Sequence, residues 1–145
     1  MIHKLGLIDY GMGNLHSVEN AFKRIGTQIY IVKRPLDLNN CTALILPGVG
    51  AFDPAMQHLE RTKLIPYIQD WIINEKPLLG ICLGLQLLFE SSEEGKSKGL
   101  GVIKGHVKKL PKTPNELIPH MGWSLLQGKR SCPLIDKKTN NNWMY

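Results

Sequence analysis

Short apolar segments alternate with helical patterns along the first 90 residues, and this alternation limits the possible fold more than any other feature. Four mainly apolar segments are predicted to be strands: 5–8, 28–32, 43–46 and 78–81. A glycine-rich turn follows the first, and Pro47–Gly50 ends the third. Between them the sequence predicts helices over 15–25, from a cap at Asp53, and over 64–73. Such alternation predicts an α/β fold with a mostly parallel central sheet and helices on both faces.

The chain beyond residue 80 follows a different pattern. Residues 85–90 predict the opening of another helix, residues 91–98 are polar and loop-like, and residues 102–110 have a more β-like pattern. The length of 145 residues suits one domain, so we expect a single domain over 1–145. Because the chain ends on the apolar cluster 142–145, where natural domains seldom stop, we expect the C-terminal part of this domain to be missing.

Composition and charge argue against several classes of protein. The chain is 43% hydrophobic and 21% charged, a globular balance, and no apolar run reaches the roughly 18 residues of a membrane span. Residues 1–95 carry 8 basic and 10 acidic side chains, a net of −2, and residues 96–145 carry 10 basic and 2 acidic ones, a net of +8. The lysines of the second part are scattered, without interleaved aromatic residues. We therefore expect a solvated basic face, or a face for an acidic partner, rather than a nucleic-acid interface.

The three cysteines are too widely spaced for a disulfide framework or a metal site: Cys41, Cys82 and Cys132. A reducing, cytoplasmic setting is the simplest expectation, with no metal and no other cofactor. The apolar N-terminal stretch is soon broken by charge, so no signal peptide is expected.

The segment Gly80–Gly84 places a cysteine between two glycines at the junction of a predicted strand and a predicted helix. This context is typical of a nucleophile elbow, whose sharp turn leaves no room for side chains two residues before and after the nucleophile. Cys82 would lie at a helix N-terminus, where unpaired N–H groups favour the thiolate. The backbone N–H of Leu83 would point to a developing oxyanion. The alternative is a buried, inert cysteine, which is the reading we prefer for Cys41 and Cys132.

The segment Pro47–Gly50 follows another predicted strand. In open α/β sheets the ligand crevice lies at the carboxyl ends of the strands, and two glycines there let backbone amides approach a ligand closely. An ordinary tight turn is the alternative.

A cysteine hydrolase also needs a base, usually a histidine held by a third group. His58 and Glu60 look like such a pair, but residues two apart on a helix point to different sides, so Glu60 could not orient His58. The other histidines offer no better candidate: His3, His16, His106 and His120. We therefore expect no base within this chain.

Four segments, taken in order, carry a resemblance to a known family: Asp9–Asn14, Pro47–Phe52, Gly80–Glu90 and Pro119–Trp123. They resemble the triad (class I) glutamine amidotransferases. The elbow alone indicates only this class. The other three segments make the whole chain similar to the amidotransferase subunits of imidazole glycerol phosphate synthases.

This resemblance implies a reaction and a set of site residues. Cys82 would attack the carboxamide of glutamine, ammonia would leave, and water would hydrolyse the glutamyl thioester. The Leu83 N–H and the backbone of Val49 and Gly50 would form the oxyanion hole, and Gly50 and Gln86 would bind glutamine.

The resemblance also implies a partner. Ammonia would pass to a cyclase subunit, a (β/α)8 barrel, in a heterodimer that serves histidine biosynthesis. Asn14, His120 and Trp123 match surfaces that face this partner. For Trp123 a core position is the alternative, because Met121 and Leu125 flank it.

In the family, the catalytic histidine and glutamate lie in a His-x-Glu motif near the C-terminus, whereas this chain stops at Tyr145. We therefore expect the 145 residues to hold the nucleophile without the base, and to have little activity alone. Three other interpretations stay open: another triad amidotransferase, such as the anthranilate or pyridoxal phosphate type; an inactive scaffold that only docks to the cyclase; and an unrelated α/β cysteine hydrolase.

Overall fold

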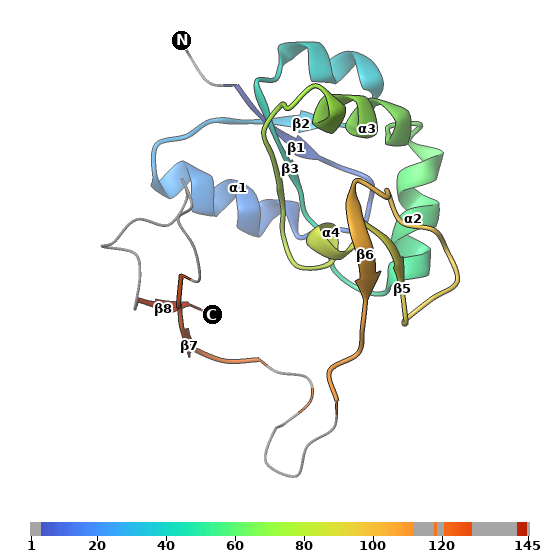
Figure 1. Cartoon of the computed structure of the whole chain (residues 1–145). Coiled ribbons are helices and arrows are strands. Elements are labelled where there is room, and N and C mark those ends of the chain that lie inside the picture. The colour runs from blue at the N-terminus through green and yellow to red at the C-terminus, as the bar shows by residue number, and fades with distance from the viewer. Residues whose placement is uncertain (1–3, 112–117, 119–120, 129–141, 145) are drawn as a thin grey trace. The chain divides into compact units, whose positions relative to one another are not determined.

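In the computed structural model, a four-stranded parallel sheet lies at the centre of the first 109 residues (Figure 1). Its strands, in the spatial order β2-β1-β3-β4, are β1 (Leu5–Ile8), β2 (Ile29–Val32), β3 (Ala43–Leu46) and β4 (Leu78–Gly80). The structure describes residues 4–111, 118, 121–128 and 142–144. All four strands lie within the segments that the sequence predicted, so the predicted parallel sheet is confirmed.

Helices cover both faces of this sheet, as predicted. Helix α1 (Leu15–Arg24) connects β1 to β2, and helices α2 (Phe52–Arg61) and α3 (Ile65–Ile73) connect β3 to β4. These two connections run across the sheet in opposite directions. Because crossover connections are right-handed, they place α1 on one face and α2 and α3 on the other (Figure 1). A 3-10 helix, η1 (Pro35–Asn40), leads from β2 to β3.

The main core lies between the sheet and the pair α2–α3. Side chains from β1 and β3 join side chains of both helices there in one buried cluster, whose members include Ile8, Leu44, Leu46, Phe52, Leu59, Ile68 and Trp71. Since neighbouring residues of a strand point to opposite faces, Leu7 and Ile45, which pair in register, belong to the other face. Helix α1 covers that face with half-buried side chains only.

The start of α2 differs from the prediction. Asp53 was expected to cap this helix, but Ala51 occupies the N-cap and the helix begins at Phe52. The carboxylate of Asp53 is used outside the helix instead, because it accepts backbone N–H bonds from Lys96 at 2.9 Å and Ser97 at 2.8 Å. Sequence patterns near a helix start do not reveal such a long-range partner.

The predicted helix over 85–90 is wrong. Helix α4 (Leu83–Gln86) is a single turn, and the chain then enters strand β5 (Phe89–Ser92), which pairs with β6 (Ile103–Val107). The carbonyl oxygens of residues 87–90 accept hydrogen bonds from N–H groups of residues 99–103 at 2.8–3.1 Å. These carbonyls therefore have partners outside the helix, and the helical pattern gives way to strand pairing. The β-like pattern over 102–110 is confirmed by β6.

Residues 110–145 form a second unit, described here by itself. Strands β7 (Ser124–Leu125) and β8 (Trp143–Met144) pair antiparallel within it. The single domain over 1–145 stays a prediction. Across the part of the chain that the structure describes, no helix has both the length and the apolar character that crossing a bilayer requires.

Candidate active site

Three segments meet at the carboxyl edge of the sheet, where β1, β3 and β4 end. The Tyr10 hydroxyl donates to the Pro47 carbonyl oxygen at 2.8 Å, which joins the turn after β1 to the segment after β3. The Val49 N–H donates to the Met12 carbonyl oxygen at 2.9 Å and adds a second connection between the same two segments. The Ile81 N–H donates to the Leu46 carbonyl oxygen at 3.0 Å and joins the elbow to β3. Parallel strands bring their ends to one edge, so the predicted motifs become neighbours.

Cys82 has the strained backbone of a nucleophile elbow. Its φ is +55° and its ψ is −118°, and it occupies the N-cap of α4. This pair of angles lies outside the usual left-handed region, and a conformation of this kind typically costs of order 1–3 kcal/mol. Cys82 is exposed, so the alternative of a buried, inert cysteine does not apply to it. The thiol lies at the site edge of the sheet in a position open to a ligand.

The glycines on either side of Cys82 are required by space, as the sequence predicted. A Cβ added to Gly80 would lie 2.7 Å from the Leu85 Cα. A Cβ added to Gly84 would overlap the Leu46 carbonyl oxygen and lie 2.7 Å from the Leu46 carbonyl carbon. These contacts are with backbone atoms, which cannot move aside without displacing a strand. The tight packing holds the elbow against the end of β3.

The first turn of α4 uses most of its backbone donors internally. Gly84 donates to the Ile81 carbonyl at 3.0 Å, and Leu85 and Gln86 donate to the Cys82 carbonyl at 3.0 and 3.3 Å. Within the described part of the chain, the Leu83 N–H has no such acceptor. Leu83 follows the nucleophile directly, and an N–H at this position is the usual donor to an oxyanion in elbow enzymes.

Strand β3 continues into Pro47–Gly50, the other segment expected to supply oxyanion donors. Gly50 has a φ of +97°, which is favourable for glycine, and a Cβ there would lie 3.1 Å from the Met12 Cε. Val49 is half exposed at its side chain, and its N–H is engaged by Met12 as described above. Gln86, the expected glutamine-binding residue, lies half-buried on the same turn as Leu83.

Tyr10 is a site residue that the sequence analysis missed. It is only 4% exposed, and burial, with a smaller contribution from the charge of Cys82, raises its pKa to about 12. The phenol therefore stays protonated and donates its hydrogen bond at neutral pH. The signal was present in the motif Asp9–Asn14, where an aromatic residue lies two positions after the strand end, but nothing in the local pattern indicated its partner 37 residues away.

Of the residues expected to face a partner, the structure describes Asn14 and Trp123. Asn14 caps α1, and its side-chain oxygen accepts the Ser17 N–H at 3.2 Å. Trp123 belongs to the second unit and is 67% exposed, so its side chain does not form a core among the described residues. His120 lies outside the described residues, as do His3 and Cys132.

The described histidines do not take the place of a base. His58 and Glu60 both lie within α2, which confirms the helical geometry that argued against them as a pair. His16 hydrogen-bonds Asn20 at 2.9 Å, and His106 hydrogen-bonds Ser91 at 2.9 Å. Among residues 4–111 none of these imidazoles forms a hydrogen bond with Cys82.

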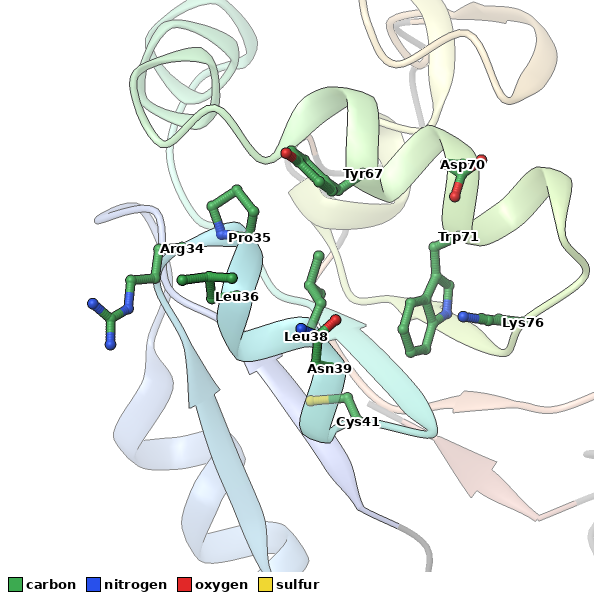
Figure 2. A pocket seen from close by; sticks show the side chains of 10 residues that line it. All are labelled: Arg34, Pro35, Leu36, Leu38, Asn39, Cys41, Tyr67, Asp70, Trp71 and Lys76. Carbon is green, nitrogen blue, oxygen red and sulfur yellow. The ribbon is translucent and has the colours of Figure 1, made fainter.

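A cavity of about 590 Å³ lies between η1 and α3, away from the elbow (Figure 2). Its lining comprises Arg34, Pro35, Leu36, Leu38, Asn39, Cys41, Tyr67, Asp70, Trp71 and Lys76. The Arg34 guanidinium pairs with Asp37 at 3.2 Å, and the Lys76 ammonium lies 4.6 Å from the centre of the Trp71 ring. Both cations of the lining therefore already have partners within the chain. Since Cys82 is not among the lining residues, we place the reactive site at Cys82 and not in this cavity.

Known proteins are similar to this chain in sequence, and a solved structure is similar to it in fold. The chain is 62% identical over 145 residues to "Imidazole glycerol phosphate synthase subunit HisH" of a strain of Prochlorococcus marinus, covering all of this chain and 68% of that protein. It is 57% identical over 141 residues to the protein of the same name from Synechococcus sp. (strain CC9902), covering 97% of this chain and 66% of that one. The chain thus spans about two thirds of the length of these curated relatives.

A solved structure described as "Crystal structure of glutamine amidotransferase" matches with a TM-score of 0.61 and 21% identity. The match covers 72% of this chain and 55% of that chain, and it supports the fold. The glutamine amidotransferase class-I family matches residues 6–145. With the elbow geometry and these relatives together, the chain belongs to the class-I glutamine amidotransferase family.

Proposed function

We propose that this chain is the glutaminase subunit of an imidazole glycerol phosphate synthase. The observation that carries the proposal is Cys82, an exposed thiol held at φ +55° on the elbow between β4 and α4. The relatives named above as HisH subunits, at 62% and 57% identity, support the choice of this synthase among amidotransferases.

The proposed reaction begins with attack of the Cys82 sulfur on the carboxamide carbon of glutamine. The negative charge then develops on the former carbonyl oxygen, where the N–H groups of Leu83 and Gly50 would stabilise it, since the Val49 N–H donates to the Met12 carbonyl. The C–N bond breaks, ammonia leaves with a proton from an acid, and a thioester remains. Water cleaves the thioester, releases glutamate and restores the thiol. Gln86 and Gly50 would hold the substrate.

Proton transfer in this scheme needs a histidine held by a carboxylate. The family resemblance assigns this role to a His-x-Glu motif near the C-terminus of its members. The only such motif in this sequence is 58–60, and helix α2 contains it. None of the described residues is therefore assigned as the base.

The proposed partner is a cyclase subunit with a (β/α)8 barrel, in the cytoplasm. Free ammonia in water is protonated and lost, so we expect this active site to be coupled to a second enzyme that consumes the ammonia. The names of the relatives describe them as subunits, which supports a two-protein assembly. Asn14, His120 and Trp123 are the residues proposed to face the cyclase.

Labelling with a glutamine-like electrophile tests the nucleophile. A chloroketone analogue of glutamine should modify Cys82, and mass spectrometry of the digested protein locates the adduct. Cys82→Ser should abolish the adduct, since an alcohol without thiolate character is a far weaker nucleophile. Cys41→Ser is the matched control, because Cys41 is half-buried and its thiol donates to the Asp37 carbonyl at 3.6 Å. Modification of Cys41 with Cys82 untouched would refute the assignment.

A further inference from the structure

Tyr10 connects the turn after β1 to the segment that follows β3. Its ring is buried, and its hydroxyl donates to the Pro47 carbonyl oxygen at 2.8 Å. Among the described residues, this hydroxyl is the only donor to that carbonyl. The bond therefore fixes the orientation of the Pro47–Gly48 peptide, from which the chain continues to Val49 and Gly50.

Gly48 lies close to both Tyr10 and the elbow. A Cβ added to Gly48 would lie 2.7 Å from the Tyr10 hydroxyl oxygen, 2.7 Å from the Gly84 nitrogen and 2.9 Å from the Leu83 Cβ. The Tyr10 hydroxyl and the residues that follow Cys82 therefore both approach the place that a Gly48 side chain would occupy. A change in the position of the phenol would therefore change the spacing between the Pro47–Gly50 backbone and the backbone that follows Cys82.

The same turn makes a second connection two residues farther on. The Met12 carbonyl accepts the Val49 N–H at 2.9 Å, and the Met12 side chain lies next to Gly50. Tyr10 and Met12 therefore form hydrogen bonds with the segment Pro47–Gly50 at two places, Pro47 and Val49. The Met12 bond is between backbone atoms, whereas the Tyr10 bond depends on a side chain and can be removed by a single substitution.

We propose that Tyr10 is a positioning residue, whose hydroxyl holds the Pro47–Gly50 backbone at the place where the oxyanion forms above Cys82. This inference rests on the glutaminase function proposed for Cys82. Tyr10 is not the general base, because its hydroxyl is already committed to Pro47 and its pKa of about 12 keeps it protonated. Ring packing alone does not explain the residue, since phenylalanine would fill the same space without the hydrogen bond.

Two electrophiles separate positioning of the oxyanion segment from general thiol reactivity. With the chloroketone analogue of glutamine, the sulfur adds to the carbonyl, an oxyanion forms, and chloride then leaves as the carbon–sulfur bond becomes permanent. With iodoacetamide, the sulfur displaces iodide in one step and no oxyanion forms. Only the first reaction depends on donors aimed at an oxyanion.

The test compares Tyr10→Phe with the parent chain, using the rate constant for modification of Cys82. We expect the chloroketone reaction to slow by about tenfold, less than the 10²–10³-fold that removal of a direct oxyanion donor causes. The iodoacetamide reaction should change by less than about twofold, because the elbow itself still holds the thiol at the N-cap of α4. Tyr67→Phe is the matched control, since this tyrosine is 51% exposed on α3. It should leave both rates unchanged.

Two results would overturn the inference. One is an unchanged chloroketone rate in Tyr10→Phe, and the other is an equal change in both reactions, which indicates a general loosening of the fold. A urea midpoint for each variant identifies such loosening directly. Failure of the glutaminase proposal has a different signature, because the chloroketone adduct would then persist in Cys82→Ser.

Discussion

At the scale of single residues, the site depends on one strained cysteine and on glycines that let the backbone close around it. Cys82 holds a φ of +55° although it is not glycine. A Cβ added to Gly48, Gly80 or Gly84 would lie within 3 Å of neighbouring backbone or side-chain atoms. The surrounding packing must therefore supply the energy that keeps the cysteine in this conformation.

Gly84→Ala should damage the elbow more than the small size of the added methyl group suggests. The new methyl group would meet the Leu46 carbonyl, a backbone group of β3 that cannot turn away. We expect a loss of about 1–3 kcal/mol in the free energy of unfolding, measured by urea denaturation, and a slower chloroketone reaction at Cys82.

Gly26→Ala is the matched control for this change. Gly26 has a φ of +75° but no atom within 4 Å of an added Cβ. Its substitution should cost only the left-handed backbone penalty, about 1–2 kcal/mol, and should leave labelling of Cys82 unaltered. Equal labelling rates in the two variants would show that the close packing at Gly84 does not shape the site.

At the scale of elements, the segment between β5 and β6 is tied to the start of α2 by one carboxylate. Asp53 accepts the N–H groups of Lys96 and Ser97 through its two oxygens. A Cβ at Gly95 would overlap this carboxylate, so a small residue is needed for the approach. These hydrogen bonds lower the pKa of Asp53, and the one from the Lys96 N–H contributes more than the one from the Ser97 N–H.

Asp53→Asn should loosen this segment. The amide keeps one acceptor oxygen, but its NH₂ group would face a backbone N–H. Trypsin should therefore cleave faster after Lys96 and Lys98 than in the parent, as followed by mass spectrometry. Asp70→Asn is the control, because Asp70 is an exposed carboxylate on α3. Equal cleavage rates in Asp53→Asn and the parent would contradict the proposed tie.

The same carboxylate predicts a pH dependence. A lowered pKa in the folded protein means that Asp53 contributes stability above the ordinary carboxyl pKa of about 3.9 and loses it as the pH falls through the lowered value. The urea midpoint of the parent should fall faster than that of Asp53→Asn over this acidic window. Parallel curves for the two proteins would show that Asp53 adds no such dependence.

At the scale of the whole molecule, Trp123 is proposed to anchor the chain to the cyclase. Trp123→Ala should weaken binding by about 2 kcal/mol, because exposed tryptophans are frequent anchors of interfaces. The melting temperature should barely change, since the side chain is 67% exposed. Trp143→Ala is a matched control, with an indole that is 66% exposed in the same unit. A lower melting temperature with unchanged cyclase affinity would remove Trp123 from the interface.

The activity of the isolated chain is a second property at this scale. No described histidine hydrogen-bonds Cys82, and acid–base help typically contributes 10²–10⁴-fold. We expect glutamine turnover by these 145 residues to be at least about 10²-fold slower than that of a version extended with the last third of the Prochlorococcus relative. Equal turnover would show that a base lies within residues 1–145.

The sequence alone determined the four strands of the sheet, the three helices α1, α2 and α3, and the elbow at Cys82. Each follows from a pattern within one short segment, such as apolar periodicity or glycines beside a cysteine, and local patterns reflect local backbone preferences. The common edge of the sheet also followed, because parallel strands end on the same side.

Only the tertiary structure decided which distant groups satisfy one another. It ended α4 after one turn, because residues 99–103 supply donors to the carbonyls of residues 87–90. In the folded chain Asp53 accepts a hydrogen bond from Lys96, 43 residues away, instead of capping a helix. The Tyr10 hydroxyl donates to the carbonyl of Pro47, 37 residues away. The physical reason is that a backbone or side-chain polar group bonds to the partner that the fold brings near it, and no local pattern in the sequence encodes that distance.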